Sequence, residues 1–208
     1  RTPITANGVT WLMILVGASI GPALLIQGWQ GIALALFLSH LQMLIDCCDG
    51  EVARWRETKS PMGIFLDKLG HYLAEGLLPI CFGLRLANWP NEQTTDSIFP
   101  FLGALLAILV IVNKGLNDAV HVARAFSGLP KIQDKSGINM PVKGILRRIR
   151  KLFNFIPAQR MFHSVEFTMY VALFGTFSQS LEIALVISLF VTIGHIAAIV
   201  SSAKLRNN

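Results

Sequence analysis

Long apolar runs dominate this chain and limit the folds that are open to it. A helix crosses the hydrocarbon core of a bilayer with about 20 consecutive apolar residues. Of the 208 residues, 53% are hydrophobic and only 14% are charged, whereas a soluble domain carries about 25% charged residues. Six runs have the required length: roughly 8–28, 30–48, 64–87, 98–122, 162–180 and 181–201. The sequence therefore predicts an all-α integral membrane protein, with six transmembrane helices in a single domain over residues 1–208.

The positive charges are grouped, and their grouping predicts an orientation. Most Lys and Arg residues cluster in three places: at Arg54, Arg56 and Lys59, between Arg124 and Arg160, and at Lys204 and Arg206. The connections at about 88–97 and 176–181 carry no Lys or Arg. Six alternating spans place every basic group on one side, which the positive-inside rule makes cytoplasmic, together with both termini. We therefore expect a multi-pass protein of the cell membrane. A soluble nucleic-acid binder is excluded, because it would not intersperse its charge between apolar runs.

The segment 125–161 is polar, but part of it has an apolar face. Residues at the spacing of one helix face are Val142, Ile145, Leu146, Ile149, Leu152, Phe153 and Ile156. The remaining positions are largely Lys and Arg. This pattern predicts an additional amphipathic helix that lies in the cytoplasmic interface and binds anionic membrane lipids. A solvated charge run is the alternative, and the apolar face argues against it.

Three carboxylates stand at the ends of apolar runs, where an unpaired charge is costly and usually marks a functional site. Asp46 and Asp49 share one helix face, and Asp67 and His71 share a face of the next helix. If the two helices pack antiparallel across the turn at 55–62, these side chains converge. Converging carboxylates require a cation, and oxygen ligands suit Mg²⁺ or Mn²⁺. Two such ions could bridge a pyrophosphate. The alternative is a polar cluster that only joins two helices.

The residues from Asp46 to His71 resemble the signature of the CDP-alcohol phosphotransferase family, D-x2-D-G-x2-A-R-x8-G-x3-D-x3-D. Every defined position matches except the last, where His71 replaces the fourth Asp. Asn7 and Thr10 resemble the family's P-N-x-x-T opening, with Ala6 in place of Pro. The resemblance implies a six-span enzyme, commonly a homodimer, with its site on the cytoplasmic side. Such enzymes transfer a phosphatidyl or other phospho-alcohol group from a CDP-linked donor to an acceptor hydroxyl in membrane-lipid synthesis, and they release CMP.

The resemblance also implies roles for individual residues. The expected ligands of two divalent metal ions are Asp46, Asp49, Asp67 and, by its position in the motif, His71. The residues expected to bind the nucleotide are Asn7, Thr10, Gly50, Ala53 and Arg54. Gly50 lacks a Cβ, so a ligand can approach the backbone there, and the donors of the Arg54 guanidinium match phosphate oxygens. Ser60 occupies the position of a polar substrate contact.

His71 admits two interpretations. An imidazole accepts protons near neutral pH, so His71 could serve as the catalytic base that the fourth Asp supplies in the family, with Glu75 and His121 as the next candidates. It is a poor Mg²⁺ ligand, so the second ion could be held weakly or the preference moved toward Mn²⁺. Alternatively, catalysis has been lost and the protein acts as a membrane scaffold or transporter. Because the other motif positions are intact, we favour an enzyme.

A polar stripe on the fourth run is the candidate acceptor site. It comprises Lys114, Asn117, Asp118, His121 and Arg124. Lys114 and Asp118 could instead form an intramembrane ion pair. Together with Arg124, the basic residues Arg147, Arg148 and Arg160 favour an anionic acceptor or lipid. The motifs do not choose between CDP-diacylglycerol with a soluble acceptor and a small CDP-alcohol with a lipid acceptor. His195, alone on an apolar run, is expected to be a packed histidine.

Overall fold

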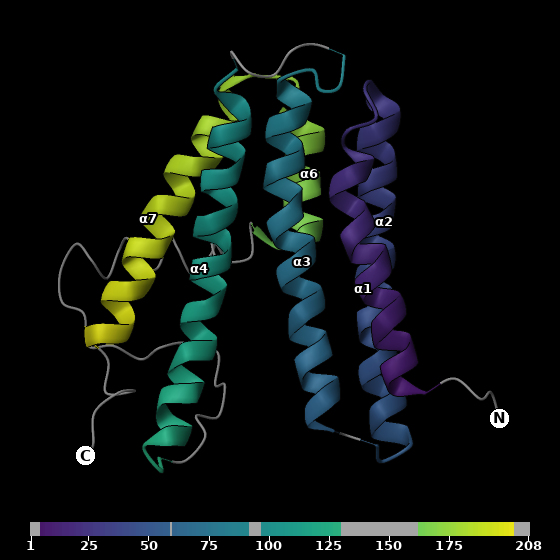
Figure 1. Ribbon diagram of the computed structural model, residues 1–208, viewed down its shortest axis with the longest axis vertical. Coiled ribbons are helices and arrows are strands. Elements are labelled where there is room, and N and C mark those ends of the chain that lie inside the picture. Colours follow the sequence, from purple (N-terminus) through teal and green to yellow (C-terminus); the bar gives the residue numbers. More distant parts are fainter. Residues whose placement is uncertain (1–4, 59, 92–96, 130–161, 202–208) are drawn as a thin grey trace.

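The structure, a computed structural model, describes residues 5–58, 60–91, 97–129 and 162–201, and throughout this part of the chain the regular elements are helices (Figure 1). They are α1 (Ala6–Ala23), α2 (Trp29–Trp55), α3 (Pro61–Leu86), α4 (Phe99–Phe126), α6 (Ser164–Phe174) and α7 (Gln179–Ser201). The predicted all-α fold is confirmed. The predicted amphipathic helix at 142–156 lies outside the described residues.

Within the described residues, four helices are long and apolar enough to cross a membrane: α1, α2, α4 and α7. At 26 residues, α3 is about 39 Å long, but polar residues such as Asp67, His71 and Glu75 interrupt it. The 11 residues of α6 extend only about 16 Å. The predicted fifth span, 162–180, is therefore too long. The chain turns after Phe174, where backbone N–H groups of Phe177 and Ser180 bond to nearby carbonyls at 3.0 Å.

Capping residues set the starts of two helices at the same end of the bundle. The Thr5 hydroxyl accepts the N–H of Gly8 at 3.1 Å, and the Ser60 hydroxyl accepts the N–H of Gly63 at 3.1 Å. Pro61 follows Ser60 as the first residue of α3, a position where its missing N–H has no cost. Because the connection from α2 to α3 is short, the end of α2 lies near the start of α3 (Figure 1).

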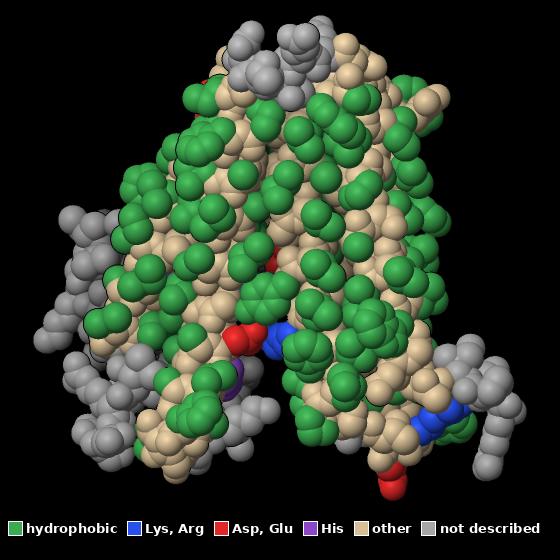
Figure 2. All heavy atoms as spheres, viewed as in Figure 1, with side chains coloured by type: hydrophobic (Ala, Val, Ile, Leu, Met, Phe, Trp, Pro, Cys, Tyr) green, Lys and Arg blue, Asp and Glu red, His purple; other side chains and the backbone are tan. Residues whose placement is uncertain are grey.

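The helices pack side by side around an apolar core. Helix α1 contacts α2 and α3, α3 contacts α4, α4 contacts α7, and α2 contacts α6. Core side chains come from all of these helices and include Ile20, Leu24, Ala35, Leu78, Phe82, Leu106, Phe167 and Leu181. Hydrophobic side chains also cover much of the outer surface (Figure 2). An apolar exterior around an apolar core is the arrangement expected of a protein surrounded by lipid.

The α3–α4 pair is packed differently at its two ends. A Cβ added at Gly103 would lie 2.5 Å from the carbonyl oxygen of Pro79, and one added at Gly83 would lie 2.4 Å from that of Phe99. The two backbones therefore touch at this end. At the other end, charged side chains gather in a hollow between the helices (Figure 2). This polar end of the bundle holds the candidate site.

Candidate active site

Two helices bring a carboxylate pair and an imidazole together. Asp46 lies on α2, whereas Asp67 and His71 lie one turn apart on α3. The His71 Nε2 atom is 3.4 Å from Asp46 Oδ1 and 3.5 Å from Asp67 Oδ1. One ligand atom from each of the three lies within 4.8 Å of the others. The convergence predicted from helix spacing is therefore present for these three residues.

Asp49 is turned toward α1 instead. Its Oδ2 accepts a hydrogen bond of 2.8 Å from the Thr10 hydroxyl, and Thr10 is 3% exposed. The Asp49 carboxylate is outside the group formed by Asp46, Asp67 and His71. Thr10, which matches the last position of the P-N-x-x-T opening, thus positions one of the motif carboxylates.

The other motif residues lie around this end of α1 and α2. A Cβ at Gly63 would lie 3.4 Å from Asn7 Oδ1, which places Asn7 against the start of α3. A Cβ at Gly50 would lie 3.4 Å from the Arg54 guanidinium. Arg54 pairs with Glu51 at 2.6 Å on the surface, and Ala53 is partly exposed beside it.

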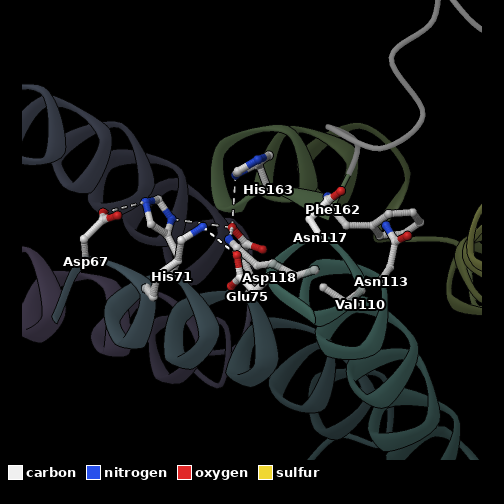
Figure 3. Close-up of a pocket in the computed structure, with 11 residues that line it drawn as sticks. Asp67, His71, Glu75, Val110, Asn113, Asn117, Asp118, Phe162 and His163 are labelled. Carbon is white, nitrogen blue, oxygen red and sulfur yellow. Dashed lines mark hydrogen bonds and ion pairs between the residues drawn. The ribbon is translucent and has the colours of Figure 1, made fainter. Parts of the chain in front are cut away.

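Glu75 forms a second cluster next to His71. Its Oε1 accepts a hydrogen bond from the Lys114 ammonium group on α4. The same oxygen lies 3.0 Å from Nδ1 of His163, the residue that precedes α6. The His71 Nδ1 atom is 3.6 Å from the same oxygen. Figure 3 shows His71 between Asp67 and Glu75, with His163 above Glu75. His71 therefore presents one ring nitrogen to each cluster.

A cavity of about 560 Å³ adjoins both clusters. Its lining comes from α3, α4 and the residues before α6: Asp67, Lys68, His71, Glu75, Val110, Asn113, Lys114, Asn117, Asp118, Phe162 and His163. Asp118 pairs with Lys68 at 3.1 Å and accepts the Tyr72 hydroxyl at 2.9 Å. The alternative of a Lys114–Asp118 ion pair is therefore wrong. Both side chains reach across to α3 rather than along their own helix.

The remaining candidates are more scattered. His121 and Arg124 lie further along α4 and are not among the lining residues. The predicted site residues Arg147, Arg148 and Arg160 lie outside the described residues. Ser60 caps α3. His195 is packed, as expected: it is 6% exposed, and its Nδ1 lies 2.7 Å from Asn113 Oδ1.

The sequence did not predict that Lys114 and His163 both contact the Glu75 carboxylate. Glu75 follows His71 by one helical turn, which is a usable signal for a shared face. His163 has no comparable signal, because its place beside Glu75 depends on how α6 packs.

A comparison with known protein families covers nearly the whole chain. The family model for CDP-alcohol phosphatidyltransferase matches residues 3–201. The chain belongs to the CDP-alcohol phosphatidyltransferase family. Members are transferases that move phosphate-substituted alcohols and use divalent metal. No curated protein matched the chain in a sequence search.

The polar end fits the metal that this family uses. The carboxylates of Asp46 and Asp67 face each other across His71 Nε2, and without a cation two such acids repel. Their oxygens are the ligands preferred by Mg²⁺ and Mn²⁺, and a ring nitrogen suits Mn²⁺ better than Mg²⁺.

Proposed function

We propose that this CDP-alcohol phosphatidyltransferase transfers a phosphatidyl or other phospho-alcohol group from a CDP-linked donor to an acceptor hydroxyl, with release of CMP. The observation that carries the proposal is the meeting of Asp46, Asp67 and His71 beside a polar cavity that Asp67 and His71 line. Such a reaction needs a cation site for a pyrophosphate and, beside it, room for a second substrate. The carboxylates and the adjoining cavity at one end of the bundle support the proposal on both counts.

Asp46, Asp49 and Asp67 would hold the divalent metal. A bound divalent ion neutralises pyrophosphate oxygens and stabilises the charge that develops during displacement. Thr10 fixes the orientation of the Asp49 carboxylate through its 2.8 Å hydrogen bond. Because Asp49 follows Asp46 by about one turn on the same face of α2, the three acids could hold two neighbouring ions.

The nucleotide would bind where α1 begins and α2 ends. Asn7 and Thr10 lie on the first turns of α1, and Gly50, Ala53 and Arg54 lie on the last turns of α2. The missing Cβ of Gly50 lets a ligand approach, while Arg54, half exposed and paired only at the surface with Glu51, can turn its guanidinium to a phosphate. Ser60 offers a hydroxyl at the adjacent start of α3.

His71 would accept the proton from the acceptor hydroxyl. Its ring lines the cavity and is also in contact with both Asp46 and Asp67. A base must lie within hydrogen-bond reach of the hydroxyl while the donor phosphate lies on the metals. Of the cavity-lining residues, His71 is the one that touches both carboxylates.

The cavity would hold the polar acceptor. Lys114 and Asp118 line it, and each already has a partner on α3, which keeps their charges compensated. His121 and Arg124 would extend this surface along α4. The proposal that the acceptor or a bound lipid is anionic depends further on Arg147, Arg148 and Arg160, outside the described residues.

We place the site on the cytoplasmic side of a six-span homodimer in the cell membrane, with the basic segment 142–156 at the interface. The grouping of Lys and Arg supports this orientation. In a cysteine-free background, Asn91→Cys and Ser127→Cys should be labelled from opposite sides, because α4 runs from one end of the bundle to the other. Labelling from the same side would remove α4 from the spans.

The test of the proposal is CMP release by purified protein in lipid nanodiscs. CDP-diacylglycerol with soluble polyols or their phosphates, and small CDP-alcohols with diacylglycerol, form the two arms of the panel. We expect metal-dependent CMP release in one arm only, which also assigns the donor. A catalytically altered scaffold or transporter would release no CMP in either arm.

A further inference from the structure

We propose that His71 Nδ1, Glu75 Oε1 and His163 Nδ1 form a site for one transition-metal ion of the Zn²⁺ type. This site is distinct from the one formed by the motif carboxylates and shares with it only the ring of His71. The proposal does not rest on the transferase reaction, because it concerns binding alone.

The three donor atoms have the spacing of ligands around one ion. The His163 nitrogen lies 3.0 Å and the His71 nitrogen 3.6 Å from the same Glu75 oxygen, and all three atoms lie within 4.8 Å of one another. Ligands bound tetrahedrally at 2.0–2.1 Å stand roughly 3.4 Å apart. The two imidazole rings are nearly perpendicular, with centroids 6.1 Å apart. Only small side-chain rotations are needed to place one ion among the three atoms.

An unsatisfied atom points into this site. His71 Nδ1 is buried and has no hydrogen-bond partner among the described residues, since 3.6 Å exceeds hydrogen-bond range. A buried polar atom without a partner is costly and calls for an explanation, such as a missing ion. A metal–nitrogen bond would use the Nδ1 lone pair and leave the imidazole proton on Nε2, which faces Asp46 and Asp67. His71 would therefore not act as a base while this ion is bound.

The donor set selects the ion. Two imidazoles and one carboxylate suit Zn²⁺, Co²⁺ or Fe²⁺, whereas the all-oxygen ligands of the motif suit Mg²⁺. Glu75 is 4% exposed, so its carboxylate is held firmly in place. All three residues also line the cavity, which leaves a fourth coordination position for water.

Lys114 competes for this site. Its ammonium group bonds to the same Glu75 oxygen, and an incoming ion must displace it. Replacing Lys114 with a neutral residue should therefore tighten metal binding, whereas replacing a ligand should weaken it. Opposite effects from neighbouring residues separate a metal site from general damage to the fold.

The experiment is a Co²⁺ titration of the purified full chain in detergent, followed by visible absorption, with Zn²⁺ as competitor. Cys47, Cys48 and Cys81 are first replaced by Ser, because free thiols also bind these ions. We expect one Co²⁺ per chain, displaced by Zn²⁺ and not by Mg²⁺. Glu75→Gln and His163→Ala should each weaken binding by more than about 100-fold, and Lys114→Met should strengthen it.

Two controls make the result decisive. Glu166→Gln, on α6 and outside the cluster, should bind Co²⁺ as the parent does. Asp46→Asn should also retain the absorption band, because it removes only a motif carboxylate. The proposal is overturned if the parent shows no band, if His163→Ala binds normally, or if Asp46→Asn abolishes binding. CMP release plays no part in the readout, so failure of the transferase assay would leave this test intact.

Discussion

The two ends of the α3–α4 pair solve the same packing problem with opposite residues. At one end Gly83 and Gly103 let the backbones touch, and no side chain lies between them. At the other end Lys68, Glu75 and Asp118 lie between the helices with partners across the gap, around a cavity of about 560 Å³. Small residues close one end of the pair, and charged residues hold the other end open.

This difference in packing explains why the candidate site lies at the open end of the α3–α4 pair. Charges inside a membrane protein persist only when they are paired or face a water-filled space. Each acid at the open end has such a partner: Asp46 and Asp67 meet His71, Asp49 meets Thr10, and Asp118 meets Lys68. The closed end supplies rigidity, and the open end supplies the groups that can act on a substrate.

Removing a motif carboxylate should have the largest effect. Asp46→Asn and Asp67→Asn each remove a charge from the proposed metal site, so CMP release should fall below detection while thermal stability is kept. Glu182→Gln, an exposed acid-to-amide change on α7, is the matched control and should remain active. Normal CMP release by either aspartate variant would place the metals elsewhere.

His71→Ala should slow turnover by about 10²–10⁴-fold, the range typical of proton transfer by a side chain. Steady-state CMP release gives this factor, and the affinity for the CDP donor should change little. His71→Asp restores the family's residue and should recover part of the rate with a stronger dependence on Mg²⁺. A near-native rate for His71→Ala would shift the base to Glu75 or His121.

Thr10→Val should reduce CMP release by roughly 10- to 100-fold, because a hydrogen bond to a charged group contributes about 1.5–3 kcal/mol. Thr10→Ser keeps the hydroxyl and should restore most of the activity. If valine and serine give equal rates, the bond to Asp49 has no part in orienting the carboxylate.

At the closed end, Gly103→Ala should lower stability without changing the chemistry. A Cβ there meets a backbone oxygen at 2.5 Å, which no rotamer change relieves, and overpacking costs typically about 1–3 kcal/mol. Thermal unfolding should show the loss, with the CMP rate per folded molecule unchanged. Gly194→Ala, with no atom within 4 Å of its added Cβ, should unfold like the parent; equal melting of both variants would contradict the close approach.

Much of the fold was predictable because apolar runs and helices in membranes coincide. The predicted runs 64–87 and 98–122 correspond to α3 and α4 within a few residues. The prediction of one span over 162–180 was wrong, because the apolar sequence continues through Phe174 and Phe177 while the backbone turns between them. Apolarity reports what lipid tolerates, and helix ends depend on local hydrogen bonds.

The site was predictable where helix periodicity governs it. The spacing of Asp67 and His71 and the short turn after α2 were enough to bring them to Asp46. The partners of Lys114 and Asp118 were not predictable, because they depend on the approach of α3 and α4, which distant glycines set. His163 reaches Glu75 through the packing of α6, which leaves no mark in the local sequence.

The most direct test of the account is the stoichiometry of the reaction in nanodiscs. With the active donor arm, we predict one CMP released for each phosphodiester product formed, loss of both on chelation, and their return with Mn²⁺ or Mg²⁺. Asp67→Asn should yield neither compound under any of these conditions. Product formation that persists in chelator or in Asp67→Asn, or binding of CDP-linked donors with no CMP released in either arm, would contradict the assignment of the open end as a phosphotransferase site.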